Sequence, residues 1–355
     1  MEWLFQYLLF FAEVFTVVIA IIAVLLFVVG LRKKGTTSTG NLELKDITDE
    51  YKNIKELMQT SIMDEAELKA FAKAQKKQCK LDKKQAKAAK KDESKQEISD
   101  TDNKEKTLNK SICYVLSFNG SIDAHEVEDL RKEISAVLSV IKPEDEVLLK
   151  LESPGGVVHG YGLAASQLVR FRNNNVPLTA VVDKVAASGG YMMACTANKI
   201  IAAPFAIIGS IGVVAQIPNF HRLLKKNDID IELQTAGQYK RTLTMLGENT
   251  DEGRQKFKEE LEETHLLFKD FVKQNRPNVN IDEVATGEHW FALQAKDRGL
   301  VDEINTSDDV ILSRIETHKI IAVKFQRRQK LTEKMAKNIV HGVERLFFKN
   351  SRTIY

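Results

Sequence analysis

The chain has 355 residues, of which 43% are hydrophobic and 28% charged, with 18 glycines, 6 prolines and 3 cysteines. This composition excludes a disulfide-rich scaffold, a collagen-like repeat and a wholly disordered chain. The formal net charge of +3 is distributed unevenly. Acidic and basic residues number 2 and 0 in residues 1–31, 15 and 20 in 32–110, 30 and 24 in 111–325, and 2 and 8 in 326–355. A mildly acidic globular body is therefore expected between two basic segments. The overall charge says nothing useful about nucleic acid, and no nucleic-acid partner is expected.

The first 34 residues carry the pattern of a transmembrane anchor. Residues 14–31 are uncharged and mostly apolar, about 27 Å of helix, which is close to the hydrocarbon thickness of a bilayer. The start is not basic, and Arg32, Lys33 and Lys34 follow the apolar run, which favours an uncleaved anchor over a signal peptide. These charges favour a single-pass protein with a cytoplasmic body. Glu13 leaves the exact span undefined, so a periplasmic body stays open.

Residues 35–110 are predicted to form a charged stalk. Nine lysines and a single acid, Asp82, fall between Lys73 and Lys91, interleaved with alanine and glutamine. Such a stretch has little apolar surface, so a solvated helix or a disordered spacer is expected, with attraction to an anionic membrane surface as the functional alternative. Residues 94–109 read as a linker. The three cysteines lack metal or redox spacing and are expected to be free thiols: Cys79, Cys113 and Cys195.

From residue 111 to 325 the pattern changes to short apolar runs that alternate with helical periods. The expected strands are Ile112–Phe118, Glu146–Leu151, Leu178–Val182, Lys199–Ala203, Ile229–Thr235 and Lys319–Phe325. The expected helices are His125–Ile141, His159–Asn173, Gly190–Ala197, Asn219–Asn227 and Thr250–Asn275. Strands alternating with helices predict an α/β domain rather than a sandwich.

Two turns of small residues follow two of these strands and are candidates for chemistry. Ser153–Gly156 reads Ser-Pro-Gly-Gly, in which paired glycines let backbone N–H groups point toward a ligand oxygen, as in an oxyanion hole. Ala186–Gly190 reads Ala-Ala-Ser-Gly-Gly and places Ser188 where a strand gives way to a helix. The Gly189 N–H would point the same way as the serine oxygen. Taken alone, each turn is also compatible with an ordinary loop.

A nucleophilic serine needs a base, and histidines are the first candidates. His159 follows the Gly-rich turn, but a position at the N-terminus of a surface helix explains it equally well. His221 and His265 fall within expected helices, where a solvated face is favoured over catalysis. His289 is the remaining candidate. The Gly-x-Ser-x-Gly signature of a serine elbow is absent, because Ala186 replaces its first glycine.

A lysine can serve instead of histidine where desolvation lowers its pKa. Lys240 lies in Ala236–Arg241, after the expected strand at residues 229–235, where a glycine turn could aim one lysine inward. Lys184, four residues before Ser188, is the rival candidate. The residues alone leave this choice open.

Other functions remain open at this stage. Gly160–Ala165 matches the dinucleotide fingerprint Gly-x-Gly-x-x-Ala, with Asp183 at a suitable distance, but its glycines come about eight residues after the strand end. An acyl-CoA enzyme of the crotonase type would leave a pairing of Ser188 with Lys240 without a purpose. A catalytically inactive membrane scaffold is the third alternative.

Five motifs occur in the order typical of one protein family. Across residues 112–305 the chain resembles the signal peptide peptidase A family of serine–lysine peptidases, most closely its single-domain, membrane-anchored branch. The separation of 52 residues between Ser188 and Lys240 also fits the dyad of that family. The matching pieces are Ser153–Gly156, Ala187–Tyr191, Ile208–Val213, Gly237–Lys240, and Thr286–Gly287 onward through Ala295 and Gly299–Asp302.

The resemblance implies a fold, a mechanism and partners. The fold would be similar to the Clp protease and crotonase superfamily, a spiral of ββα units. Ser188 would be the nucleophile and Lys240 the general base of a serine endopeptidase, with the N–H groups of Gly156 and Gly189 as oxyanion donors and with no metal or organic cofactor. Substrates would be peptides or membrane-derived polypeptides at the bacterial inner membrane. Relatives form rings, so a homo-oligomer is expected, and the dyad could cross a subunit boundary.

Residues 326–355 form a basic C-terminal segment. Apolar residues recur at helical spacing, namely Leu331, Met335, Ile339 and Val343. This pattern predicts an amphipathic helix that packs on the body or on another subunit, with membrane-surface association as the alternative.

Overall fold

The computed structural model describes residues 40–71, 73, 76, 77 and 111–327, together with eight positions among the first 18. The predicted membrane span at residues 14–31 falls largely outside the described residues, and so do most of the Lys-rich stretch, the linker and the segment after residue 327. Among the described residues, no helix combines the length and apolar character needed to cross a bilayer. Two compact units are distinguished, residues 1–41 with 326–355 and residues 42–325. The second unit carries the fold.

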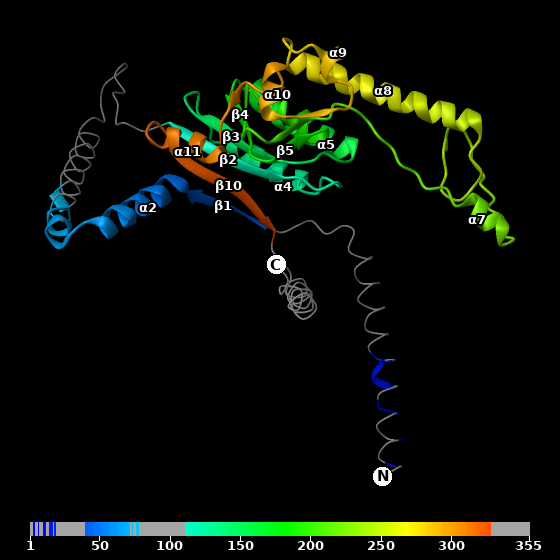
Figure 1. The fold of residues 1–355 in the computed structure, drawn as a ribbon, viewed down its shortest axis with the longest axis horizontal. Helices are drawn as coiled ribbons and strands as arrows, with labels where there is room; N and C mark the ends of the chain where they lie inside the picture. Colours follow the sequence, from blue (N-terminus) through cyan, green and yellow to red (C-terminus); the bar gives the residue numbers. More distant parts are fainter. Residues whose placement is uncertain are drawn as a thin grey trace, which may run out of the picture. The chain divides into compact units, whose positions relative to one another are not determined.

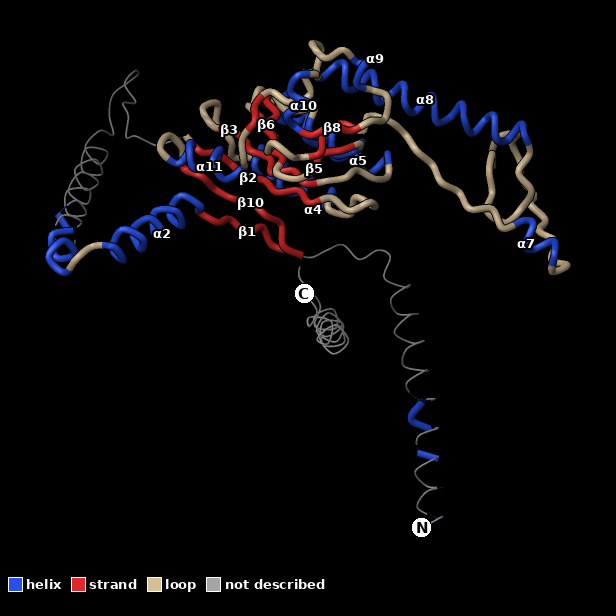
Figure 2. Tube along the Cα trace, viewed as in Figure 1, coloured by secondary structure: helices blue, strands red, loops and turns tan. Residues whose placement is uncertain are grey.

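A seven-stranded sheet forms the centre of this unit (Figures 1 and 2). Neighbouring strands run parallel from β10 through β2, β3, β4 and β6 to β9, and β1 lies beside β10 at the edge. The strands are β1 (Gly40–Asp46), β2 (Ile112–Asn119), β3 (Glu146–Glu152), β4 (Leu178–Val182), β6 (Lys199–Ala202), β9 (Glu303–Ile304) and β10 (Lys319–Arg327).

Helices cover both faces of the sheet because its central strands are apolar on both sides. Along β3, Val147 and Leu149 face one apolar cluster and Leu148 faces the other, as the two-residue period of a strand requires. The larger cluster includes residues of α4 (Val127–Leu138), α5 (Val158–Asn173), α6 (Gly189–Ala194) and α8 (Asp251–Asn275). The smaller one is covered by α2 (Ile47–Ile62) and α11 (Ser307–Ile315).

A second, three-stranded sheet lies beside the first. It consists of β5 (Val185–Ala187), β7 (Ile207–Gly209) and β8 (His289–Phe291), with β5 parallel and β8 antiparallel to β7. The chain sends β4 to the large sheet and β5 to the small one, and then repeats the step with β6 and β7. The short helices α9 (Ile281–Val284) and α10 (Ala292–Asp297) complete this part. The expected α/β class is confirmed.

One of the expected strands is wrong. Residues 229–235 form no strand and are exposed along their whole length, although Ile229, Ile231 and Leu233 alternate as in a half-buried strand. They belong to the arm, residues 213–250, which also contains α7 (His221–Lys226). Alternation predicts a strand only where a partner strand is present, and within one chain the described residues supply none here.

Part of the predicted stalk belongs to the sheet. The expectation that residues 35–110 form no packed structure does not hold for β1 and α2, because Ile47 and Tyr51 pack against the smaller apolar cluster. Thr48 is only 4% exposed, and its Oγ1 accepts a 2.7 Å hydrogen bond from the Ile320 N–H of β10. Asp46 caps α2 by accepting from the Asp49 N–H. The high charge of this segment is carried by its solvent face.

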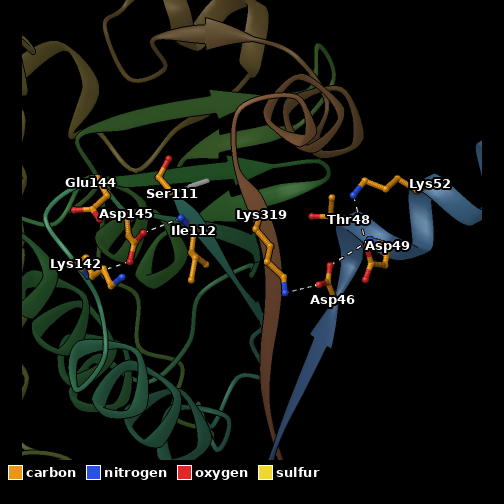
Figure 3. A pocket seen from close by; sticks show the side chains of 10 residues that line it. All are labelled: Asp46, Thr48, Asp49, Lys52, Ser111, Ile112, Lys142, Glu144, Asp145 and Lys319. Atoms are coloured by element: carbon orange, nitrogen blue, oxygen red, sulfur yellow. Dashed lines mark hydrogen bonds and ion pairs between the residues drawn. The ribbon is translucent and has the colours of Figure 1, made fainter. Parts of the chain in front are cut away.

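A polar pocket of about 530 Å³ opens where α2 meets the starts of β2 and β10 (Figure 3). The Asp145 carboxylate accepts from the Ile112 and Lys142 N–H groups, and Lys319 pairs with Asp46 at 2.9 Å. These lining groups are thus already engaged with one another. The pocket lies at the amino ends of parallel strands, whereas both small-residue turns lie at carboxyl ends.

The Thr48 hydrogen bond fastens α2 to the sheet. We expect Thr48→Val to lower the free energy of unfolding by about 1–3 kcal/mol, because a shape-conserving change leaves the buried Ile320 N–H without an acceptor. Thr60→Val in the same helix is the matched control and should change stability far less, because the Thr60 hydroxyl donates to the Glu56 carbonyl oxygen of its own helix. Thermal unfolding of both variants measures the difference, and equal melting temperatures would contradict the assignment.

Glu133 of α4 holds the far end of β10 and should make stability depend on pH. Its carboxylate is 5% exposed and accepts a 2.7 Å hydrogen bond from the Phe325 N–H, and burial raises its pKa to about 7 despite that bond. The folded state therefore binds the proton more tightly than the unfolded state. The resulting stability is complete below about pH 4.3 and is lost as pH rises through 7, by about 3 kcal/mol.

Glu133→Gln tests this dependence, because the amide oxygen can still accept from Phe325 but carries no charge. We expect the variant to match the wild type near pH 4 and to be the more stable protein at pH 8, as measured by thermal unfolding. A wild type whose stability varies with pH in parallel with Glu133→Gln would show that Glu133 does not titrate in this range.

Candidate active site

Ser188 stands at the junction of β5 and α6 in a strained backbone conformation. Its φ of 51° and ψ of −119° are rare for a residue with a side chain. The two residues that follow, Gly189 and Gly190, have no room for a side chain. A Cβ on Gly189 would lie 2.4 Å from the Tyr161 ring, and one on Gly190 would lie 2.4 Å from the Ser153 carbonyl oxygen. The backbone of Gly189 and Gly190 is therefore packed closely against Tyr161 and Ser153, while Ser188 itself stays partly exposed.

Backbone hydrogen bonds leave the amide beside Ser188 unused. The Ala187 N–H donates to Ser153 O at 3.0 Å, and the Ser188 N–H donates to Gly209 O at 2.8 Å. The Ser188 side chain makes no capping hydrogen bond to α6. In the described part of the chain, Gly189 is then the first residue of this turn whose N–H has no acceptor.

The Ser-Pro-Gly-Gly turn lies directly against this serine. Gly155 has φ of 89°, and a Cβ on it would fall 2.8 Å from both the Ser188 Cβ and the Gly189 nitrogen. Gly156 has its own constraint, because a Cβ there would fall 2.1 Å from the carbonyl oxygen of Ile122. The structure thus brings together the two turns that the sequence singled out.

Hydrogen-bond accounting leaves a single N–H in this second turn. Pro154 has no N–H, the Gly155 N–H donates to Ser153 Oγ at 3.1 Å, and the Val157 N–H donates to Ile122 O at 2.9 Å. Within the residues that the structure describes, the Gly156 N–H has no acceptor, and Gly156 is exposed. One unoccupied amide on each turn, next to a serine hydroxyl, can bind an oxygen that carries developing negative charge.

Lys240 is not brought to Ser188 within one chain. It lies on the exposed arm, and its neighbours contact the first turns of α8: Gln238 donates to Glu252 at 3.3 Å, and Lys256 lies over the Tyr239 ring. Helix α8 packs into the core through Phe268 and Val272, at least twelve residues further along, or about 18 Å. Over the described residues, no hydrogen bond joins Lys240 to Ser188.

The other candidate bases are engaged elsewhere or lie on exposed positions. Lys184 pairs with Glu152 at 3.0 Å on the surface. His265 of α8 lies 3.2 Å from the carbonyl oxygen of Ile211. His159 and His289 are exposed, and His221 begins α7 on the arm. None of these side chains is hydrogen-bonded to Ser188 within the described ranges.

The dinucleotide-like fragment is part of a packed helix. Gly160–Ala165 lies inside α5 rather than in a turn between strand and helix, and Ala164 and Ala165 are buried. A Cβ on Gly160 would meet that of Ala124 at 2.7 Å, so this glycine serves helix packing. The geometry that the fingerprint needs for a pyrophosphate is absent from this fragment.

Sequence comparison places the chain among peptidases. Residues 2–168 match the family described as Peptidase family S49 N-terminal, and residues 170–320 match Peptidase family S49. The chain therefore belongs to peptidase family S49. The resemblance inferred from the sequence motifs is thereby confirmed.

Relatives over nearly the whole chain are named as proteases. The protein named Probable protease SohB of Haemophilus influenzae is 51% identical over 342 residues, which cover 94% of both chains. One of the same name from Buchnera aphidicola subsp. Schlechtendalia chinensis is 49% identical over 316 residues, covering 88% of this chain and all of that protein. Among solved structures, the 1510-N membrane-bound stomatin-specific protease in complex with a substrate peptide aligns with a TM-score of 0.40 at 13% identity, covering 65% of this chain and 98% of the other.

The contact between the two turns leaves no room for a side chain at Gly155. We expect Gly155→Ala to abolish peptide hydrolysis, because the new methyl group would displace Ser188 and a φ of 89° strains any residue but glycine, by about 1–3 kcal/mol. Gly162→Ala is the matched control, since a Cβ there meets nothing within 4 Å and alanine favours the helix. It should keep full activity. Equal hydrolysis rates for the two variants would contradict the site.

Proposed function

We propose that the protein is a serine endopeptidase in which Ser188 attacks the substrate carbonyl and the N–H groups of Gly156 and Gly189 stabilise the oxyanion. One observation carries the proposal: the Gly156 and Gly189 N–H groups, which have no acceptor among the described residues, belong to the two turns that meet at this serine. Membership of a peptidase family supplies the reaction class. Ser188 is only partly buried, so a substrate can reach it.

Acyl-enzyme chemistry follows from these groups. A neutral Lys240 amine takes the hydroxyl proton as Ser188 Oγ bonds to the peptide carbonyl carbon, and the carbonyl oxygen becomes an oxyanion held by the two amides. The carbon–nitrogen bond then breaks, and the protonated lysine returns its proton to the leaving amine. Water attacks the ester with the same base and releases the acid. These steps need no metal and no organic cofactor.

The base is supplied by a neighbouring subunit in this proposal. Lys240 is remote from Ser188 in its own chain, and the arm that carries it exposes large apolar side chains, notably Val214, Ile217, Leu223, Leu233 and Leu246. Exposed apolar surface on this scale favours burial against another copy of the chain. Burial in a homo-oligomer would also remove water from around the Lys240 amine, and desolvation favours the neutral form of an amine.

In this proposal, residues 14–31 anchor the protein in the bacterial inner membrane as a single-pass protein with a cytoplasmic body. The apolar run and the basic cluster after it support this topology. Placement beside the bilayer favours peptides and membrane-derived polypeptides as substrates. The strand, strand, helix repeat of β4, β5 and α6 agrees with a Clp and crotonase type of spiral. An acyl-CoA enzyme or an inactive scaffold on that fold would not require Ser188 or Lys240.

Subunit mixing tests the dyad and its placement together. We expect Ser188→Ala and Lys240→Ala each to abolish hydrolysis, whereas Lys184→Ala stays active. Because one subunit would supply the serine and the next the lysine, mixed oligomers of the two inactive variants should regain about a quarter of wild-type activity, the share of sites that receive both groups. Activity retained by Lys240→Ala would reject the lysine. Absence of recovery in mixed oligomers would place the dyad within one chain.

A further inference from the structure

A buried chain of hydroxyl groups lies directly behind the Ser-Pro-Gly-Gly turn. Ser153 and Tyr161 are both 0% exposed, and their oxygens are 2.6 Å apart. The Tyr161 hydroxyl donates to the Ser121 carbonyl oxygen at 2.8 Å, and Ser153 Oγ accepts from the Gly155 N–H at 3.1 Å. Gly120 makes room for both hydroxyls, because a Cβ on it would fall 2.4 Å from the tyrosine oxygen.

The direction of every proton in this chain is determined. The carbonyl of Ser121 can only accept, so the single proton of the Tyr161 hydroxyl goes to it. Burial raises the pKa of Tyr161, so this proton stays in place at neutral pH. The tyrosine oxygen must then accept from Ser153, which leaves the serine oxygen free to accept from the Gly155 N–H. The order is Gly155 N–H to Ser153 to Tyr161 to Ser121.

The N–H of Gly155 is thereby turned inward, and this orients the peptide that follows. Gly155 and Gly156 are consecutive, and the carbonyl of Ile122 fixes the far side of the turn through the Val157 N–H. A turn held at both of these amides presents the Gly156 N–H outward as its remaining donor. If the first hold is lost, the Gly155 N–H is free to rotate outward, and the Gly156 donor moves with it.

We propose that Ser153 and Tyr161 are positioning residues that aim the Gly156 N–H at the oxyanion by fixing the Gly155 N–H from behind. This inference rests on the proposed function, since it concerns the oxyanion site of Ser188. Neither side chain touches the substrate. Their effect is confined to the transition state, where charge develops on the carbonyl oxygen, and not to substrate binding.

The test is the steady-state kinetics of Ser153→Ala and Tyr161→Phe in the full-length protein. We expect kcat to fall at least about tenfold in each, part of the 10²–10³ that loss of an oxyanion donor costs, with KM nearly unchanged. The affinity of a peptide boronate, whose tetrahedral adduct on serine places an oxygen in the same site, should fall in parallel with kcat. Tyr161→Phe keeps the ring that packs on Gly189 and so preserves the turn itself.

The two residues act through one chain, so their effects should not add. The double variant should be no slower than the slower single variant, whereas two independent structural defects would multiply. Thr48→Val is the matched control, a buried hydroxyl lost from the opposite end of the sheet. It should lower the melting temperature and leave kcat unchanged. Ser153→Thr, which keeps a hydroxyl, should recover activity relative to Ser153→Ala.

The outcomes separate this inference from the proposed function. An inactive Ser188→Ala alongside wild-type kcat in Ser153→Ala and Tyr161→Phe would overturn the positioning role and leave the peptidase mechanism standing. Multiplicative losses in the double variant, or losses confined to KM, would also overturn it. An active Ser188→Ala would instead remove the proposed function, and the positioning role with it.

Discussion

The site depends on one contact, the approach of the Gly155 backbone to Ser188 and Gly189. It arises because the chain leaving β3 pairs with the small sheet. Ser153 forms a parallel bridge with Ala186 of β5, in which its N–H donates to the Val185 carbonyl and its own carbonyl accepts from the Ala187 N–H. One turn is thus held by the large sheet and the other by the small sheet. Because Gly155 lacks a Cβ, the two turns meet with nothing between them. The closeness of Ser188 to the Ser-Pro-Gly-Gly turn follows from this bridge between the two sheets.

The strained backbone at Ser188 is tolerated because hydrogen bonds on both sides of the residue fix its conformation. A left-handed backbone at a serine costs about 1–3 kcal/mol. The Ser188 N–H is fixed on β7 through Gly209, and the following helix is anchored by Tyr191, which is fully buried and donates to the Leu300 carbonyl. Neither end of the turn can relax without breaking buried hydrogen bonds. The same rigidity holds the Gly189 N–H in place before any substrate arrives, which is the preorganisation that oxyanion binding needs.

Five of the seven strands of the large sheet are predictable from the sequence, whereas β1, β9 and the small sheet are not, for a physical reason. Strand β3 and its neighbour β4 are buried on both faces and form apolar runs, and their predicted bounds agree with the structure within a few residues. Strands β5, β7 and β8 have three residues each, too few to show a period. The alternation at Ile229–Thr235 misled because it was read without a partner strand. The packing of segment Gly40–Ile62 is not evident from the sequence, because its many charged residues conceal the few that pack.

The candidate site also has parts that the sequence predicts and parts that it does not. Paired glycines in the sequence indicate close backbone approach, so both turns are predictable. Tyr161 has the pattern of any buried aromatic residue on a helix, and only the hydrogen bonds of its hydroxyl group indicate a further role. A single chain does not bring Lys240 and Ser188 together, because within the described residues the arm that carries the lysine is hydrogen-bonded only to α8 and to itself. If that arm is covered by a second copy, the burial that stabilises the assembly also desolvates the lysine amine. A separate subunit would then be folded but lack a base, and peptide hydrolysis would be confined to the assembled protein.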